Sequence, residues 1–218
     1  MQKLIITSDG SHTIFIPELN EHYHSIYGAV QESRHVFITN GLDFCTLSHL
    51  NILEIGFGTG LNALLTSLQI YGTTRSVEYT AVEKYPLDER IIEMLNHKNI
   101  SGYRSESIFH LIHSAKWDTV EEITDNFTVK KIRGDINEVS IDIKFDLIYF
   151  DAFGPDKQPG MWTTGIFEKI SAATNTGGIF VTYSAKGQVK RNLRSCGFTV
   201  SLLPGPPGKR QMIRAIKI

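Results

Sequence analysis

Apolar residues recur along the chain with two alternating periods, and these predict which segments form strands and which form helices. Short runs rich in β-branched and aromatic residues, typical of buried strands, are separated by segments with apolar residues three or four positions apart, typical of helices. The pattern predicts strands at residues 51–56, 77–83, 127–132, 145–150 and 178–183, and helices at about 60–71, 86–97, 105–116, 162–174 and 186–195. Strands that alternate with helices pair in parallel, so we expect a mostly parallel, doubly wound α/β sheet.

The two ends of the chain depart from this alternation. Residues 4–7 and 13–16 are short β-type runs around a Ser-Asp-Gly-Ser turn, which predicts an N-terminal hairpin. Residues 20–48 are polar and aromatic, and we expect a helix and a loop there. The last two predicted strands, 199–203 and 211–218, flank a turn rich in proline and glycine, which predicts an antiparallel hairpin.

The composition favours one soluble α/β enzyme. With 41% hydrophobic and 21% charged residues in 218, the chain can bury a full core, and we expect an N-terminal appendage at residues 1–48 and one main domain at 49–218. No apolar run approaches the roughly 20 residues of a membrane span, and no signal peptide is evident, so we expect a cytoplasmic protein without membrane contact. Cys45 and Cys196 share no metal-binding spacing with histidines, which favours buried thiols and no metal site.

A glycine-rich motif follows the first long strand, and it predicts a nucleotide-type ligand. Three alternate glycines let the backbone approach a ligand closely and lead into the N-terminus of a helix. The third glycine comes one residue earlier than in the dinucleotide fingerprint, and the acid before the first glycine would repel pyrophosphate. A ligand with positive charge fits better, and S-adenosylmethionine carries both an ammonium and a sulfonium. A tight turn needed only for packing is the alternative. The cofactor-binding candidates in this motif are Glu54, Gly56, Gly58, Gly60, Leu61 and Asn62.

Three further acids stand at the ends of predicted strands, where ligands of doubly wound sheets bind. Glu83 lies 23 residues after Gly60, close to the separation at which an acid accepts hydrogen bonds from ribose hydroxyls. Asp135 could accept from an adenine amino group. Helix capping is the alternative for Glu83, and a plain turn residue is the alternative for Asp135.

Asp151 is the third acid, and it opens a loop in which aromatic residues and a methionine gather as far as Trp162. Turn chemistry alone explains the prolines and glycines of this loop but not its acid and aromatic residues. A carboxylate here can orient a nucleophilic amine and accept its proton. Phe153 and Trp162 could stack on a splayed base.

The net charge of −1 hides an asymmetry along the chain. Residues 169–218 hold 9 Lys and Arg and no acid, whereas residues 1–168 hold the other 13 basic residues and all 23 acids. On the predicted helix at 186–195, one basic face could be formed by Lys186, Lys190, Arg191 and Arg194. This asymmetry favours a polyanionic partner such as a nucleic acid over an ordinary solvated surface.

Three motifs together resemble one family. They are Phe57-Gly58-Thr59-Gly60-Leu61-Asn62, the Asp151 loop as far as Trp162, and the late Gly208-Lys209-Arg210-Gln211-Met212. This combination resembles the bacterial tRNA wobble-uridine aminomethyl methyltransferases, which comprise the methyltransferase half of the bifunctional MnmC enzymes and their stand-alone MnmD relatives. Gly154 stands where we expect alanine in that family.

The resemblance implies a class I S-adenosylmethionine-dependent methyltransferase of Rossmann-like fold. It implies N-methylation of the 5-aminomethyl group on the wobble (2-thio)uridine of tRNA, without a metal. The fused family members also carry a flavin-dependent oxidase, which would here be a separate partner.

The resemblance also implies roles for individual residues. Asp151 would handle the amine, and Glu83 and Asp135 would line the cofactor groove with the glycines. Lys209 and Arg210 would contact phosphates of the anticodon stem-loop, unless they form a solvated turn. Glu32 would close over the cofactor, or act as a structural acid.

Three other functions compete with this interpretation. A methyltransferase of small-molecule amines is disfavoured only by the C-terminal charge and the family resemblance. A nicotinamide oxidoreductase is opposed by the glycine spacing, and a non-catalytic cofactor-binding module by the intact Asp151 loop.

Overall fold

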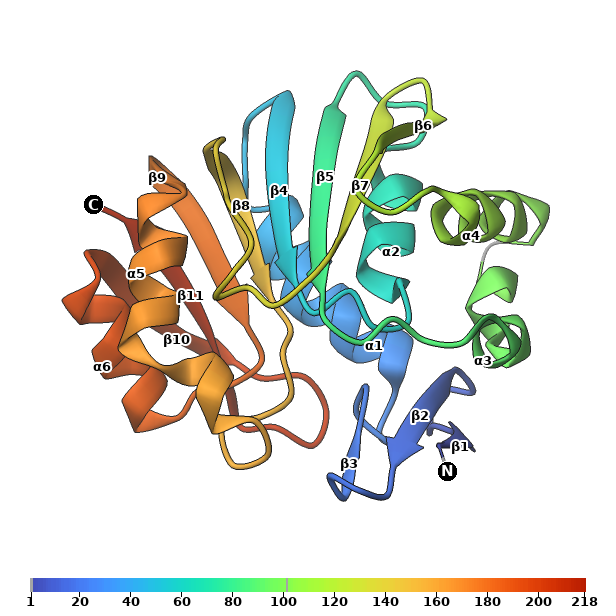
Figure 1. The fold of residues 1–218 in the computed structure, drawn as a ribbon, viewed down its shortest axis with the longest axis horizontal. Coiled ribbons are helices and arrows are strands. Elements are labelled where there is room, and N and C mark those ends of the chain that lie inside the picture. The colour runs from blue at the N-terminus through green and yellow to red at the C-terminus, as the bar shows by residue number, and fades with distance from the viewer. Residues whose placement is uncertain (1, 101) are drawn as a thin grey trace.

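A mixed eight-stranded sheet forms the centre of the molecule (Figure 1). The computed structural model describes residues 2–100 and 102–218. The strands of this sheet are β4 (His49–Ile55), β5 (Ser76–Glu83), β6 (Val120–Thr124), β7 (Phe127–Arg133), β8 (Phe145–Phe150), β9 (Thr174–Thr182), β10 (Phe198–Pro204) and β11 (Gln211–Lys217). Their order is β10-β11-β9-β8-β4-β5-β7-β6.

The pairing of these strands confirms the predicted doubly wound sheet. β4 lies in the middle and pairs in parallel with β5 and β8, and the parallel pairing continues outward to β7 and β9. β10 and β11 form the predicted antiparallel hairpin, in which β11 lies between β9 and β10. β6 pairs antiparallel with β7 and was not predicted, because its sequence VEEIT has the polar pattern of an edge strand.

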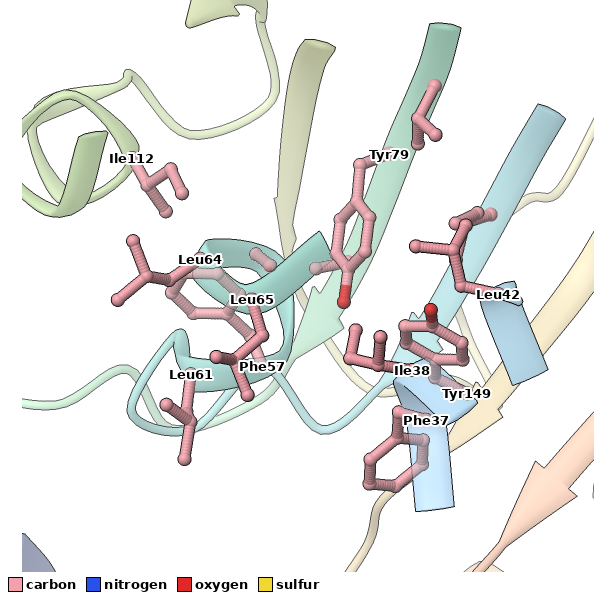
Figure 2. Packing of buried hydrophobic residues seen from close by; sticks show 14 of the residues in the cluster. Phe37, Ile38, Leu42, Phe57, Leu61, Leu64, Leu65, Tyr79, Ile112 and Tyr149 are labelled. Atoms are coloured by element: carbon pink, nitrogen blue, oxygen red, sulfur yellow. The ribbon is translucent and has the colours of Figure 1, made fainter. Parts of the chain in front are cut away.

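Helices cover both faces of the sheet. One face packs against α2 (Leu61–Ile70), α4 (Tyr103–Ser114) and a helical segment formed by α1 (Ala29–Ser33) and the π-helical η1 (Arg34–Leu42). The other face packs against α5 (Thr164–Ala172) and α6 (Gly187–Ser195). Figure 2 shows part of the hydrophobic core between the sheet and the face covered by α2 and η1. In this core, Tyr79 and Tyr149 of the sheet lie close to Phe37, Ile38 and Leu42 of η1. In the described part of the chain, no helix is long and apolar enough to span a bilayer.

Two predicted helices are shorter in the structure. The segment predicted as one helix at 86–97 divides into α3 (Glu89–Met94) and a 3₁₀ turn, η2 (Asn96–Asn99), because the fully buried Leu95 between them is extended. The segment predicted as a helix at 162–174 begins instead with a 3₁₀ turn, η3 (Pro159–Trp162), and an extended Thr163 before α5.

A small sheet of β1 (Lys3–Ile6), β2 (His12–Ile16) and β3 (Glu21–His22) contains the predicted N-terminal hairpin and one further strand. It lies below the lower edge of the main sheet in Figure 1. The hairpin turn holds the start of α1, because Asp9 Oδ2 accepts a hydrogen bond of 2.9 Å from the backbone N–H of Gln31. The N-terminal segment is thereby fixed beside the carboxyl ends of the parallel strands.

Candidate functional site

A cavity of about 1110 Å³ lies at the carboxyl ends of the parallel strands. Gly56 and Gly58 line it after β4, Glu83 at the end of β5, Asp135 after β7 and Asp151 after β8. Residues of the N-terminal segment and of the β10–β11 turn complete the wall. The expectation that ligands bind beyond the carboxyl ends of the strands therefore agrees with the position of this cavity.

The backbone of the glycine motif requires glycine at all three alternate positions. Gly56, Gly58 and Gly60 have φ values of +91°, +50° and +70°. A Cβ on Gly56 would lie 2.8 Å from the carbonyl oxygen of Asp151, and one on Gly58 would lie 2.9 Å from the ring of Tyr23. The turn therefore brings its backbone against both the Asp151 loop and the N-terminal segment, with no space for a side chain.

Four predicted cofactor residues lie beneath the cavity. Gly60, Leu61, Asn62 and Glu54 are buried, and none of them is among the described residues that line the cavity. Glu54 faces inward because Asn62 Nδ2 donates a hydrogen bond of 2.9 Å to its Oε1. We therefore revise the role of these residues from direct cofactor contact to support of the residues above them.

Glu83 and Asp135 are fixed acids on the cavity wall. Glu83 Oε2 accepts from the N–H of Gly58 at 3.0 Å, and its Oε1 accepts from the N–H of Tyr85 at 2.8 Å. Asp135 Oδ2 pairs with Lys84 Nζ at 2.9 Å, and hydrogen bonding to this lysine lowers the pKa of Asp135 to about 2. Asp135 is therefore an ionised acceptor at neutral pH.

Among the acids on the cavity wall, Asp151 has the pKa that is shifted most from its ordinary value. Burial, and next to it the charge of Glu32, raises the pKa of Asp151 to about 7. Asn62 Nδ2 donates to Asp151 Oδ2 at 2.8 Å, which opposes this rise. Beneath it, burial also raises the pKa of Glu54 well above its ordinary value. Asp151 is thus held in place by an amide that it shares with a second acid.

The two predicted aromatic residues of the Asp151 loop differ in position. Phe153 lines the cavity, and its ring centroid lies 5.1 Å from that of Tyr23. Trp162 is 4% exposed and packs against Phe150, and its Nε1–H donates to the carbonyl oxygen of Phe153 at 2.8 Å. The prediction that Trp162 stacks on a base is therefore wrong, since its ring is a core side chain that positions Phe153.

The predicted basic residues divide between the surface and the cavity. Lys186 is exposed and pairs with Asp156, Arg191 is exposed, and Lys190 is half-buried on α6. Arg210 is exposed, whereas its neighbour Lys209 lines the cavity and pairs with Glu32. The predicted phosphate contact of Lys209 is therefore replaced by a contact within the cavity.

Two tyrosines that line the cavity were not among the site residues predicted from the sequence. Tyr183 follows β9, and its hydroxyl donates to the carbonyl oxygen of Ala152 at 2.8 Å, while Tyr23 comes from the N-terminal segment. Tyr183 could have been found from the sequence, because it stands at the end of a predicted strand as the acids do.

Among the described residues, no group of three or more His, Cys, Asp or Glu is arranged to hold a metal ion.

Both the sequence and the fold of this chain are similar to those of known proteins. The model of a family described as S-adenosyl-L-methionine-dependent methyltransferase matches residues 102–218. The crystal structure of MNMC2 from Aquifex aeolicus superimposes on 99% of the chain and 70% of its own, with a TM-score of 0.83 and 27% sequence identity.

Two relatives are each called tRNA 5-methylaminomethyl-2-thiouridine biosynthesis bifunctional protein MnmC. The protein from Campylobacter hominis is 30% identical over 78% of this chain and 26% of its own length. The protein from Paraburkholderia xenovorans is 26% identical over 92% of this chain and 33% of its own length. The chain thus spans about a third or less of the length of these two relatives.

Proposed function

Because the chain belongs to the family of S-adenosyl-L-methionine-dependent methyltransferases, we propose that it methylates the 5-aminomethyl group of the wobble (2-thio)uridine in tRNA. The product is 5-methylaminomethyl-(2-thio)uridine. The similarity to two proteins named for the biosynthesis of this nucleoside, and to MNMC2 over nearly the whole chain, supports the substrate. The observation that carries the proposal is Asp151, a half-buried carboxyl group on the cavity wall beside the glycine motif.

The residues of the cavity fit the cofactor. Gly56 and Gly58 present backbone without a side chain to the cavity, and the wall beside them carries the acid Glu83. We assign Glu83 to the ribose hydroxyls, since each of its oxygens has a lone pair beyond the one that accepts a backbone N–H. We assign Asp135 to the adenine amino group. When bound, the cofactor supplies a methyl group already activated by the sulfonium.

Asp151 acts on the substrate amine. A primary alkylamine resembling lysine has a pKa near 10.4, so it arrives mainly as an ammonium at neutral pH. Asp151 binds this ammonium and accepts its proton, and a base with a pKa of about 7 is matched to that task. Asn62 holds Asp151 Oδ2, and we assign Oδ1 to the amine.

The basic C-terminal part of the chain provides the surface for tRNA. Lys190 and Arg191 of α6 and Arg210 after β10 are the residues that we assign to phosphates of the anticodon stem-loop. This substrate implies activity in the cytoplasm. A preceding reaction must expose the aminomethyl group, and we propose that a separate flavin-dependent oxidase supplies it.

Nucleoside mass spectrometry tests this function. In a strain that lacks the gene, tRNA should accumulate 5-aminomethyl-(2-thio)uridine, and the purified protein with S-adenosylmethionine should convert it to the methylated nucleoside. Calorimetric titration should show binding of S-adenosylhomocysteine and none of NAD. Unchanged wobble nucleosides in the deletion strain, together with no conversion in vitro, would exclude the proposed substrate.

A further inference from the structure

Two charged side chains from distant parts of the sequence meet in the cavity wall. Glu32 lies on α1, 177 residues before its partner Lys209, which lies in the β10–β11 turn. Lys209 Nζ donates to Glu32 Oε1. The Glu32 side chain is 8% exposed and that of Lys209 is 32% exposed. Because Glu32 is almost fully buried, solvent screens this pair less than it screens a fully exposed ion pair.

Several contacts fix the place of this pair. Glu32 Oε2 accepts from the backbone N–H of Ser25 at 2.7 Å, and the ammonium of Lys209 lies 4.8 Å from the ring centroid of Tyr183. The residue before Lys209 must be glycine, because Gly208 has a φ of +83° and a Cβ there would lie 2.2 Å from the ring of Tyr27. Neither charge is therefore free to leave the wall without moving its neighbours.

The pair is close to Asp151 in both geometry and charge. Tyr183, which underlies the Lys209 ammonium, donates to the carbonyl oxygen of Ala152, the residue next to Asp151. Glu32 and Lys209 act on Asp151 in opposite directions, because the carboxylate raises its pKa and the ammonium lowers it. Glu32, Lys209 and Asp151 all line the same cavity, so both charges face the space that Asp151 faces.

We propose that the Glu32–Lys209 pair is a positioning element that sets the charge state in which Asp151 meets the substrate amine. The inference rests on the proposed function, since it concerns the acid assigned to that amine. Lys209 occupies Glu32 Oε1, so a substrate ammonium is directed to Asp151 rather than to a second carboxylate in the cavity. Its charge also offsets that of Glu32, which would otherwise keep Asp151 protonated and unable to accept a proton.

The test measures the titration of Asp151 without relying on activity. The side-chain carboxyl groups of aspartate are labelled with ¹³C, the Asp151 resonance is assigned by its loss in Asp151→Asn, and its midpoint is followed by NMR. Lys209→Met should raise the midpoint and Glu32→Gln should lower it, each on the order of one pH unit. The double variant Glu32→Gln/Lys209→Met should titrate close to the wild type.

Two controls separate this effect from a loss of structure. Lys209→Arg keeps the positive charge and should leave the midpoint near that of the wild type. Lys186→Met removes the ion pair with Asp156, which lies outside the cavity, and should not move the midpoint. An Asp151 midpoint that is the same in wild type, both single variants and the double variant would overturn the proposal.

A parallel measurement distinguishes this outcome from failure of the proposed function. The acid limb of the single-turnover rate against pH, measured with aminomethyl-bearing tRNA, should move with the NMR midpoint in each variant. If the midpoints shift but the wild type methylates no tRNA, the substrate assignment is wrong and the electrostatic role of the pair stands. If the rates fall with no change in midpoint or pH limb, the pair merely joins two segments and the proposal fails.

Discussion

At the scale of single residues, the site depends on one amide. Asn62 gives both hydrogens of its Nδ2 group to carboxyl groups, one to Glu54 and one to Asp151. Burial raises the pKa of both acceptors, so the amide lies between two acids that are harder to ionise than an exposed carboxyl group. A buried polar group is costly when it loses its partner, so Asn62 can keep this orientation only while both acids are in place.

Asp151→Asn tests the acid directly. The amide keeps nearly the same shape but cannot accept a proton, so single-turnover methylation should fall by roughly a hundredfold or more. Affinity for S-adenosylhomocysteine, measured by calorimetry, should change much less. Raising the pH should partly restore the rate of the variant, since more of the amine then arrives neutral. A rate near that of the wild type at saturating cofactor would defeat the assignment.

Gly58→Ala tests the glycine motif. The new Cβ meets the Tyr23 ring at 2.9 Å and occupies a backbone conformation with φ of +50°, so the ring must move within the cavity wall. We expect affinity for S-adenosylhomocysteine to fall by about tenfold or more, which corresponds to about 1.4 kcal/mol. Gly165→Ala on α5 is the matched control, because a Cβ there meets nothing within 4 Å. Equal affinities in the two variants would contradict the role of Gly58.

At the scale of elements, α6 and the β10–β11 turn concentrate positive charge in different ways. Residues of α6 place their charges at the surface, whereas the turn divides its two basic residues between the surface and the cavity. The number of basic residues in the sequence therefore overestimates the number of positive charges that can contact phosphates.

Lys190→Ala/Arg191→Ala should weaken tRNA binding and reduce its salt dependence. Each lost phosphate contact lowers the slope of log affinity against log salt by about 0.9, so the double variant should lose up to about 1.8. Lys209→Met should leave this slope unchanged, since its ammonium pairs with Glu32. Lys116→Ala, an exposed residue that follows α4 on the other face of the sheet, is the control. If the wild type, the double variant, Lys209→Met and Lys116→Ala all show the same slope, α6 does not belong to the tRNA interface.

The elements also show how far the sequence predicts the structure. The central strands and α2 were predicted because burial imposes a local period on their residues, as in β8, where five of the six positions are buried. β6 was missed because only Ile123 of its five residues is buried. The strand-end acids Glu83, Asp135 and Asp151 were found on the cavity wall, because parallel strands bring their carboxyl ends together. The burial of Trp162 and the direction of Lys209 depend on contacts with distant residues, which no local pattern encodes.

At the scale of the whole molecule, two buried histidines and the half-buried His113 link the glycine motif to the helical layer. Thr59 Oγ1 lies 2.7 Å from His24 Nε2, and the Thr59 carbonyl oxygen accepts from His113 Nε2 at 3.2 Å. His97 packs against His24 and is fully buried, and neither of its ring nitrogens has a hydrogen-bond partner among the described residues. Burial lowers the pKa of His24 and of His113 to about 4, and that of His97 well below its ordinary value.

His97→Leu should make the fold less sensitive to acid. A histidine whose pKa is lowered in the folded state stays neutral there, whereas in the unfolded chain it binds a proton below about pH 6.5. Above pH 6.5, His97 is neutral in both states and does not reduce the free energy of unfolding. As the pH falls below this value, only the unfolded chain gains the proton, and the free energy of unfolding decreases. Between pH 7.5 and 5, the wild type should therefore lose more free energy of unfolding than the variant. Denaturant unfolding at both pH values measures this difference, and an equal loss in both proteins would show that His97 does not contribute.

The position of β11 has a consequence for synthesis on the ribosome. Among the strands of this sheet, β11 comes last along the described chain, yet it lies between β9 and β10 and is the strand through which β10 joins the sheet. While Gln211–Lys217 remains in the exit tunnel, β9 has an open edge whose N–H and C=O groups are unpaired, and β10 has no docking partner. The nascent sheet is thus exposed to strand pairing with other chains in the interval between emergence of Thr182 and emergence of Lys217.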